Sequence, residues 1–164
     1  MPTGVAMIGC WFLAGYAAHA EIGVFGLRRT EREQLANSGL PLDGVLERLL
    51  AAPRNVLAVL LILRTFALVG GSYAAFVLGT SLADGWVPVG AAHALVAVAV
   101  VAASLLGHVF IGDVVPRAIA LRSPLTAARR VAPLQWLLQI VLWPLHAPIE
   151  RFGALVTSLF VTRE

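Results

Sequence analysis

The chain has 164 residues, of which 59% are hydrophobic and only 13% are charged, and its mean hydropathy is +0.86. Ordinary soluble domains carry about 25% charged residues, and a fold this small could not bury so much apolar surface. The composition therefore excludes an ordinary soluble domain. It predicts a single all-α integral membrane domain over residues 1–164.

The charge pattern narrows the possible partners. The chain has twelve arginines, no lysine and nine acidic residues, so its net charge is +3. The use of arginine in place of lysine is typical of GC-rich coding, so we expect a bacterial source. The arginines are scattered among apolar segments instead of gathering with aromatic residues on one polar domain. This argues against nucleic acid and favours the headgroups of the lipid bilayer. The single cysteine, Cys10, is interpreted as a packing residue.

The first apolar segment covers about residues 4–27. It has no acidic or basic residue from Pro2 to Ala20 and is long enough to cross about 30 Å of hydrocarbon. We expect it to be retained as a membrane helix, because residues 1–4 lack the positive charge of a secretory signal.

Residues 28–55 are polar and form a membrane-proximal segment. Thr30 and Glu33 have the spacing of a capping box, and Gly39 followed by Pro41 predicts the end of a short helix. A second short helix follows, with apolar and polar side chains on opposite sides: Val45, Leu46, Leu49 and Leu50 against Asp43, Glu47 and Arg48. We expect amphipathic cytoplasmic helices over residues 30–52, lying at the membrane surface.

Two further spans are predicted at about residues 56–82 and 87–112. The second span contains one charged residue, Arg64, and the third contains none. Asp113 closes the third span, and Pro116 is expected to break the chain soon afterwards. Cytoplasmic helices are predicted over residues 117–161.

Arginines flank the spans on one side of the membrane only. They are Arg28, Arg29, Arg32, Arg48, Arg54, Arg117, Arg122, Arg129 and Arg130. The positive-inside rule then predicts a multi-pass protein of the cell (plasma) membrane, with its N-terminus outside and its C-terminus in the cytoplasm.

The segment from Val131 to Val161 is apolar but carries polar residues and prolines. The polar residues at helical spacing are Gln135, Gln139, His146 and Glu150, and the prolines are Pro133, Pro144 and Pro148. We interpret this segment as broken helices lying along the inner leaflet, with Trp136 and Trp143 as interface anchors. A fourth crossing is the alternative, because the apolar stretch is just long enough to span.

Ionisable residues inside the spans are the candidate functional residues, because each costs about 2.5–3.5 kcal/mol near the bilayer centre. Glu21 and His19 lie late in the first span, Arg64 lies early in the second and Asp113 ends the third. All four fall toward the same side of the membrane, so we expect them to converge on one polar site. The alternatives are that Glu21 and Asp113 sit at the interface and that Arg64 extends its head group to lipid phosphates.

The sequence does not predict an enzyme. His19, His93 and His108 are interpreted as polar packing residues, because no pair of them has the spacing, with a carboxylate, of a zinc site. An aspartyl intramembrane protease needs two embedded aspartates, and Asp113 has only loop aspartates as possible partners. No base accompanies a serine or the cysteine at nucleophile spacing.

Several motifs in order along the chain resemble one family. They are Ala20-Glu21-Ile22, Gln34-Leu35-Ala36, Pro53-Arg54, Gly112-Asp113-Val114-Val115-Pro116-Arg117, Ala120-Leu121-Arg122-Ser123-Pro124, Val131-Ala132-Pro133 and Trp143-Pro144-Leu145. This order and spacing resemble the cyclin M/CorC (CNNM) transmembrane domain of the hemolysin-related magnesium and cobalt efflux proteins. The fourth motif is similar to that family's Gly-Glu-(Ile/Val)-(Leu/Phe)-Pro-Lys signature.

The resemblance implies three transmembrane helices with cytoplasmic belt helices, a homodimer, and one cation site per protomer. It implies Mg²⁺ as the transported ion, with Na⁺ as a possible coupling ion. In the family, serines of the first span, asparagines of the second span and the signature carboxylate supply the oxygen ligands that Mg²⁺ prefers. The family's paired CBS module cannot fit after Glu164. The chain is therefore either a bare membrane domain or a fragment.

The expected ion-site region departs from the family at its ligands. The region comprises Ala18, Ala20, Glu21, Leu63, Arg64, Leu68, Gly112, Asp113 and Pro116. The serine positions are Ala18 and Ala20, and the asparagine positions are Arg64 and Leu68. Asp113, and more weakly Glu21, remain as possible metal ligands. We expect a degenerate site in which Arg64 replaces the cation by pairing with Asp113 and Glu21.

Two functions follow from this resemblance. The chain is expected to be a CorC/CNNM-type membrane protein associated with Mg²⁺ efflux. The alternative is a non-transporting membrane subunit that forms a heterodimer with a full-length relative and modulates it.

Overall fold

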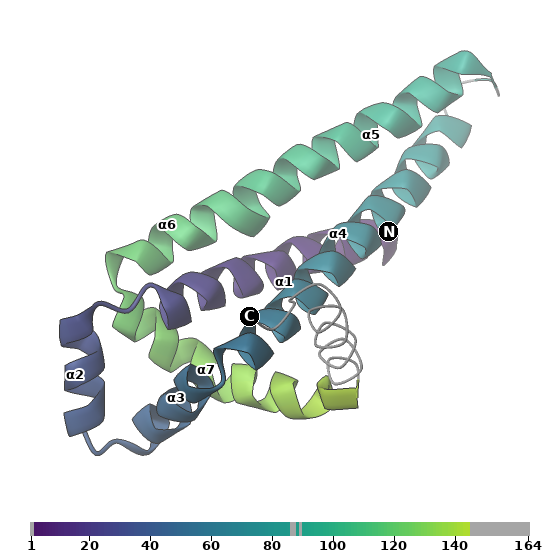
Figure 1. Ribbon diagram of the computed structural model, residues 1–164. Coiled ribbons are helices and arrows are strands. Elements are labelled where there is room, and N and C mark those ends of the chain that lie inside the picture. The colour runs from purple at the N-terminus through teal and green to yellow at the C-terminus, as the bar shows by residue number, and fades with distance from the viewer. Residues whose placement is uncertain (1, 86–87, 89, 145–164) are drawn as a thin grey trace, which may run out of the picture.

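The computed structural model describes residues 2–85, 88 and 90–144, and this part of the chain is helical without strands. Three rods are long and apolar enough to cross a membrane (Figure 1). They are α1 (Pro2–Phe25), α4 (Pro53–Asp84), and a third rod formed by α5 (Ala91–Val109), the π-helical turn η1 (Phe110–Val114) and α6 (Val115–Arg122). The predicted all-α fold is confirmed, and the three predicted spans are present among the described residues.

Small residues bring the three rods close together. A Cβ atom added at Gly70 or Gly71 of α4 would lie 3.3 Å from the side chain of Cys10 in α1. A Cβ atom added at Gly79 would lie 2.8 Å from the Cα of Ala97 in α5. Small residues at helix crossings are typical of membrane proteins. Within lipid the hydrophobic effect does not favour association of helices, so close packing must hold them together. The glycines of the second span are therefore contact points for its neighbours.

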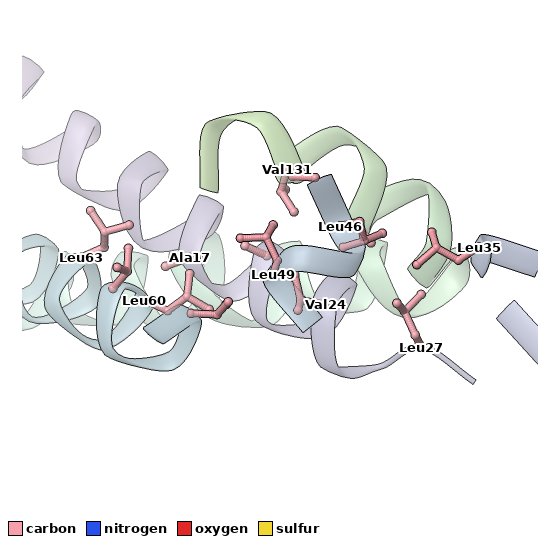
Figure 2. Close-up of a cluster of buried hydrophobic side chains, with 14 residues drawn as sticks. Ala17, Val24, Leu27, Leu35, Leu46, Leu49, Leu60, Leu63 and Val131 are labelled. Atoms are coloured by element: carbon pink, nitrogen blue, oxygen red, sulfur yellow. The ribbon is translucent and has the colours of Figure 1, made fainter. Parts of the chain in front are cut away.

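Three shorter helices gather at one end of the rods: α2 (Arg29–Asn37), α3 (Pro41–Ala51) and α7 (Pro124–Val141) (Figure 1). The main cluster of buried apolar side chains joins these helices to α1 and α4 (Figure 2). Its labelled members are Ala17, Val24, Leu27, Leu35, Leu46, Leu49, Leu60, Leu63 and Val131. The short helices are thus packed onto the ends of the spans through a common core.

The start of α2 differs from the predicted capping box. The helix begins one residue before Thr30, and the Glu31 carboxylate accepts the backbone N–H of Arg28 at 2.8 Å. Glu33 instead pairs with Arg29 at 3.1 Å. The predicted helix end is correct, because Gly39 adopts a φ of 61°, which a residue with a side chain rarely does.

Two prolines expected to break helices do not break them. The rod continues through Pro116, because the preceding π-helical turn interrupts the usual hydrogen-bond ladder at the point where proline cannot donate. Helix α7 likewise runs through Pro133 to Val141 and ends there, just before Pro144. The buried face of α7 packs on α1 and α3, which offsets the lost hydrogen bond.

The predictions for the C-terminal segment are only partly covered by the structure. Gln135, one of the polar residues at helical spacing, is buried, and its Oε1 accepts a hydrogen bond from the Tyr16 hydroxyl of α1 at 3.4 Å. Residues 145–161, with His146, Pro148 and Glu150, lie outside the described residues. The predicted broken helices and the alternative fourth crossing therefore remain predictions.

Candidate functional site

The side chain of Arg64 connects all three spans. Its Nη1 donates a hydrogen bond to Oε2 of Glu21 in α1 at 3.2 Å, and its Nη2 donates one to Oδ1 of Asp113 in η1 at 2.7 Å. The expected contacts of Arg64 with both carboxylates are therefore present. A planar guanidinium suits this position, because its fork of N–H donors can reach two acceptors at once.

A second arginine, Arg117 of α6, contacts the same two carboxylates. Its Nη2 donates to Oε2 of Glu21 at 3.0 Å, and its Nε lies 3.1 Å from Oδ1 of Asp113 without the alignment of a hydrogen bond. Glu21, Arg64, Asp113 and Arg117 thus form a four-charge centre. Two positive and two negative side chains face one another, so the centre is neutral without any bound ion.

Arg117 is not among the residues predicted for this centre, because its position marks it only as one of the arginines that flank the spans. A signal was present, since Arg117 follows Asp113 by four residues. Residues at this spacing lie on one face of a helix, and an acid placed before a base there forms a favourable pair.

The η1 turn places Asp113 where it meets both arginines. Gly112 is buried against α1, where an added Cβ atom would lie 3.0 Å from the Cβ of Ala14. An added Cβ atom at Gly15 would lie 3.1 Å from Cγ of Pro116. These tight contacts hold the carboxylate-bearing turn against the first span. A π-helical turn within an α-helical rod is often found at functional sites.

The four-charge centre is only partly shielded. The side chains of Arg64, Glu21, Arg117 and Asp113 are 38%, 33%, 34% and 28% exposed. Arg64 also borders two cavities. One, of about 270 Å³, is lined by Arg64, Thr65, Leu68, His108, Val109 and Asp113. The other, of about 100 Å³, is lined by Glu21, Leu57, Leu60, Leu61 and Arg64.

The other predicted site residues lie near the centre but add no charged group to it. Ala18 and Ala20 are fully buried, and Leu63 is nearly so. Leu68 is exposed and lines the larger cavity. His19 does not join the carboxylates as expected; its Nδ1 lies 3.2 Å from the backbone oxygen of Pro116.

The centre fits a metal ion poorly. Within the described residues, no three side chains of His, Cys, Asp or Glu come together where they could hold one. The two carboxylates, Glu21 and Asp113, are each already in contact with two guanidinium groups. A dication at these carboxylates would therefore lie beside two fixed positive charges, which would repel it.

A second, separate ion pair fastens α3 to α7. Nε and Nη2 of Arg129 donate to the two carboxylate oxygens of Asp43 at 2.8 and 2.7 Å, and the Ser38 hydroxyl also donates to this carboxylate. These hydrogen bonds, that from Arg129 foremost, hold the pKa of the Asp43 carboxyl below its ordinary value, although burial alone would raise it. Asp43 is 2% exposed, so its predicted place on the polar face of the helix was wrong.

Three apolar spans that enclose a neutral group of four charged side chains define a multi-pass membrane protein with a polar centre between its helices. The chain belongs to the family of the cyclin M transmembrane N-terminal domain (CNNM), whose model matches residues 5–164. This match confirms the resemblance seen in the sequence motifs. The family is of the transporter type, linked to divalent cation transport, and is not an enzyme family. Comparison with curated proteins gives no significant match.

Proposed function

We propose that the chain is a CorC/CNNM-type membrane protein associated with Mg²⁺ efflux, in which the guanidinium of Arg64 takes the place of the cation. The observation that carries this proposal is the position of Arg64 between Glu21 and Asp113, at 3.2 and 2.7 Å. A guanidinium stays protonated in proteins, so its positive charge is permanent. It would repel a dication that approached the same carboxylates.

The small number of oxygen atoms available to coordinate Mg²⁺ supports the same proposal. Mg²⁺ prefers six oxygen ligands in a near-ideal octahedron at about 2.0–2.1 Å. Ala18, Ala20, Arg64 and Leu68 offer no side-chain oxygen at the positions where the resemblance leads us to expect them. The remaining carboxylates are neutralised within the chain, so an entering dication would leave the centre with an uncompensated double charge.

The neutral centre also favours a second candidate function, that of a non-transporting membrane subunit. Such a subunit would dimerise with an intact full-length relative and modulate it, whereas a homodimer of this chain would hold two centres without a cation. In either case we place the protein in the cell membrane, with its N-terminus outside and its arginine-rich helices in the cytoplasm.

Flux measurements test the proposal. The purified chain in liposomes, with a Mg²⁺ indicator inside and a Na⁺ gradient across the membrane, is expected to give no Mg²⁺ flux above empty liposomes. Co-reconstitution with a full-length relative from the same source then tests the modulating role. Mg²⁺ transport by the chain alone would overturn the proposal, because Arg64 would then not prevent dication binding.

A matched pair of variants distinguishes a true absence of Mg²⁺ flux from a failed reconstitution. Arg64→Asn removes the fixed charge and supplies an amide oxygen, whereas Arg29→Asn removes a charge from an exposed pair on α2. Binding of Mn²⁺ is measured by electron paramagnetic resonance. We expect it to increase in Arg64→Asn but not in Arg29→Asn. Equal binding by the wild type and Arg64→Asn would contradict the role of the guanidinium.

A further inference from the structure

A cavity of about 360 Å³ lies where α4 begins and α7 ends, and the proposed function does not use it. Five residues line it: Asn55, Trp136, Gln139, Ile140 and Trp143. Two tryptophans and two amide side chains therefore line one open space. Trp136 is 44% exposed and Trp143 is 62% exposed, so both rings remain accessible at the rim.

The order of residues along α7 explains this lining. Gln139 and Ile140 follow Trp136 by three and four residues, which places the three on one face of the helix. Trp143 comes directly after the helix ends at Val141 and its capping residue. The opposite wall is provided by Asn55, in the first turn of α4.

One of the lining residues, Gln139, carries a polar atom that lacks a partner. Nε2 of Gln139 is buried, and no acceptor for it exists among the residues that the structure describes. A buried N–H group without an acceptor is unfavourable, and native proteins rarely leave one in that state. A ligand oxygen in the cavity would remove this cost once the Gln139 amide turns its N–H toward the cavity.

The position of the cavity indicates which ligand is available. Helix α4 has 32 residues, or about 48 Å at 1.5 Å per residue, and so exceeds the roughly 30 Å of the hydrocarbon layer. Its first turn, with Asn55, therefore falls within reach of the lipid headgroups. Tryptophan is enriched at this level of a membrane, where the ring is apolar and its N–H is polar.

A basic residue adjoins one of the lining residues in the sequence. Arg54 directly precedes Asn55 and is exposed. Basic residues at the membrane surface attract anionic headgroups, and a guanidinium binds phosphate oxygens well. We propose that this cavity binds the headgroup and ester region of a glycerophospholipid. The amides of Asn55 and Gln139 donate hydrogen bonds to its oxygens, and the two indole rings pack against its glycerol and upper acyl carbons.

Lipid binding to the purified full chain tests this proposal. Native mass spectrometry, with phosphatidylglycerol titrated into the detergent, counts the lipids that stay bound. The double variant Asn55→Leu/Gln139→Leu removes both amides but keeps apolar bulk, and we expect about tenfold weaker binding. The control Gln34→Leu alters an exposed amide on α2 and is expected to change the affinity by less than about twofold.

Two further measurements decide the outcome if the double variant fails to fold. Arg54→Gln is expected to lower the preference for phosphatidylglycerol over phosphatidylcholine, because it removes only the charge. Inorganic phosphate at millimolar concentration is expected not to displace the lipid. No bound lipid in the wild type, unchanged binding by the folded double variant, unchanged lipid preference in Arg54→Gln, or full displacement by inorganic phosphate would each overturn the proposal.

Discussion

Nη2 of Arg64 lies 2.7 Å from Oδ1 of Asp113 and thereby joins the second span to the π-helical turn of the third. The same guanidinium reaches Glu21 of the first span at 3.2 Å. Arg64 thus contacts both other spans through its one guanidinium group, beside the contact of Arg117 with Glu21. The position of the three spans relative to one another should therefore respond to changes at Arg64.

Replacement of Arg64 by leucine should destabilise the protein. Glu21 and Asp113 would retain only Arg117, and the centre would carry one uncompensated negative charge. We expect a loss of about 1–3 kcal/mol, below the value for a fully buried pair because the side chains are about one-third exposed. Thermal unfolding in detergent, followed by circular dichroism, measures the change.

A double-mutant cycle with Asp113→Leu isolates the interaction between Arg64 and Asp113. The two substitutions should be clearly non-additive. The control Arg29→Leu breaks an exposed pair on α2 and should cost less than about 0.5 kcal/mol. Additive effects of Arg64→Leu and Asp113→Leu would show that the contact contributes nothing to stability.

Arg64→Lys tests the geometry of the site separately from its charge. A lysine ammonium is a compact point charge and does not present the planar fork that reaches Glu21 and Asp113 together. The unfolding midpoint of Arg64→Lys should therefore lie between those of the wild type and Arg64→Leu. Equal midpoints for Arg64→Lys and the wild type would mean that charge alone matters there.

The ion pair between Asp43 and Arg129 should make stability depend on pH. The pKa of Asp43 is lowered in the folded protein, so its contribution is fully present above the unfolded value of about 3.9 and is lost as the pH falls through the folded value. The unfolding midpoint of the wild type should exceed that of Asp43→Asn at neutral pH. This difference should shrink as the pH falls below about 4.

A matched control for this titration is Glu33→Gln, which alters an exposed carboxylate on α2. Its midpoint should stay close to that of the wild type across the same pH range. A constant difference between the wild type and Asp43→Asn at every pH would contradict the assigned ionisation.

The spans and two of the charged contacts could be predicted from the sequence. Long apolar segments indicate membrane helices directly. Unpaired polar groups are too costly in lipid for most other backbone structures to cross it. The same cost singles out Glu21, Arg64 and Asp113 as residues that need partners inside the membrane. Their pairing follows from charge and from their similar depth.

The remaining features depend on contacts between segments far apart in the sequence. The burial of Asp43 requires α7 to bring Arg129 beside it. The local sequence of α3 does not predict this partner. The continuation of the rod through Pro116 depends on a π-helical turn. Proline alone predicts a break, because the energy that holds the turn comes from packing against α1.

The contact between α1 and α7 gives a last prediction, for Gly23. An added Cβ atom there would lie 2.8 Å from the backbone N of Ala128 and 3.1 Å from the backbone C of Ala127. Backbone atoms cannot move aside as a flexible side chain can. Gly23→Ala should therefore push α7 away from α1 and cost about 1–3 kcal/mol, despite the better helix propensity of alanine.

Gly9→Ala provides the control for Gly23→Ala within the same helix. No atom lies within 4 Å of a Cβ added at Gly9, so only helix propensity should change there. We expect Gly9→Ala to leave the unfolding midpoint unchanged or to raise it by an amount equivalent to at most about 1 kcal/mol. Gly23→Ala should lower the midpoint, and proteolysis should cleave α7 faster once its packing on α1 is lost. A rise for both variants would mean that α7 does not rest against Gly23.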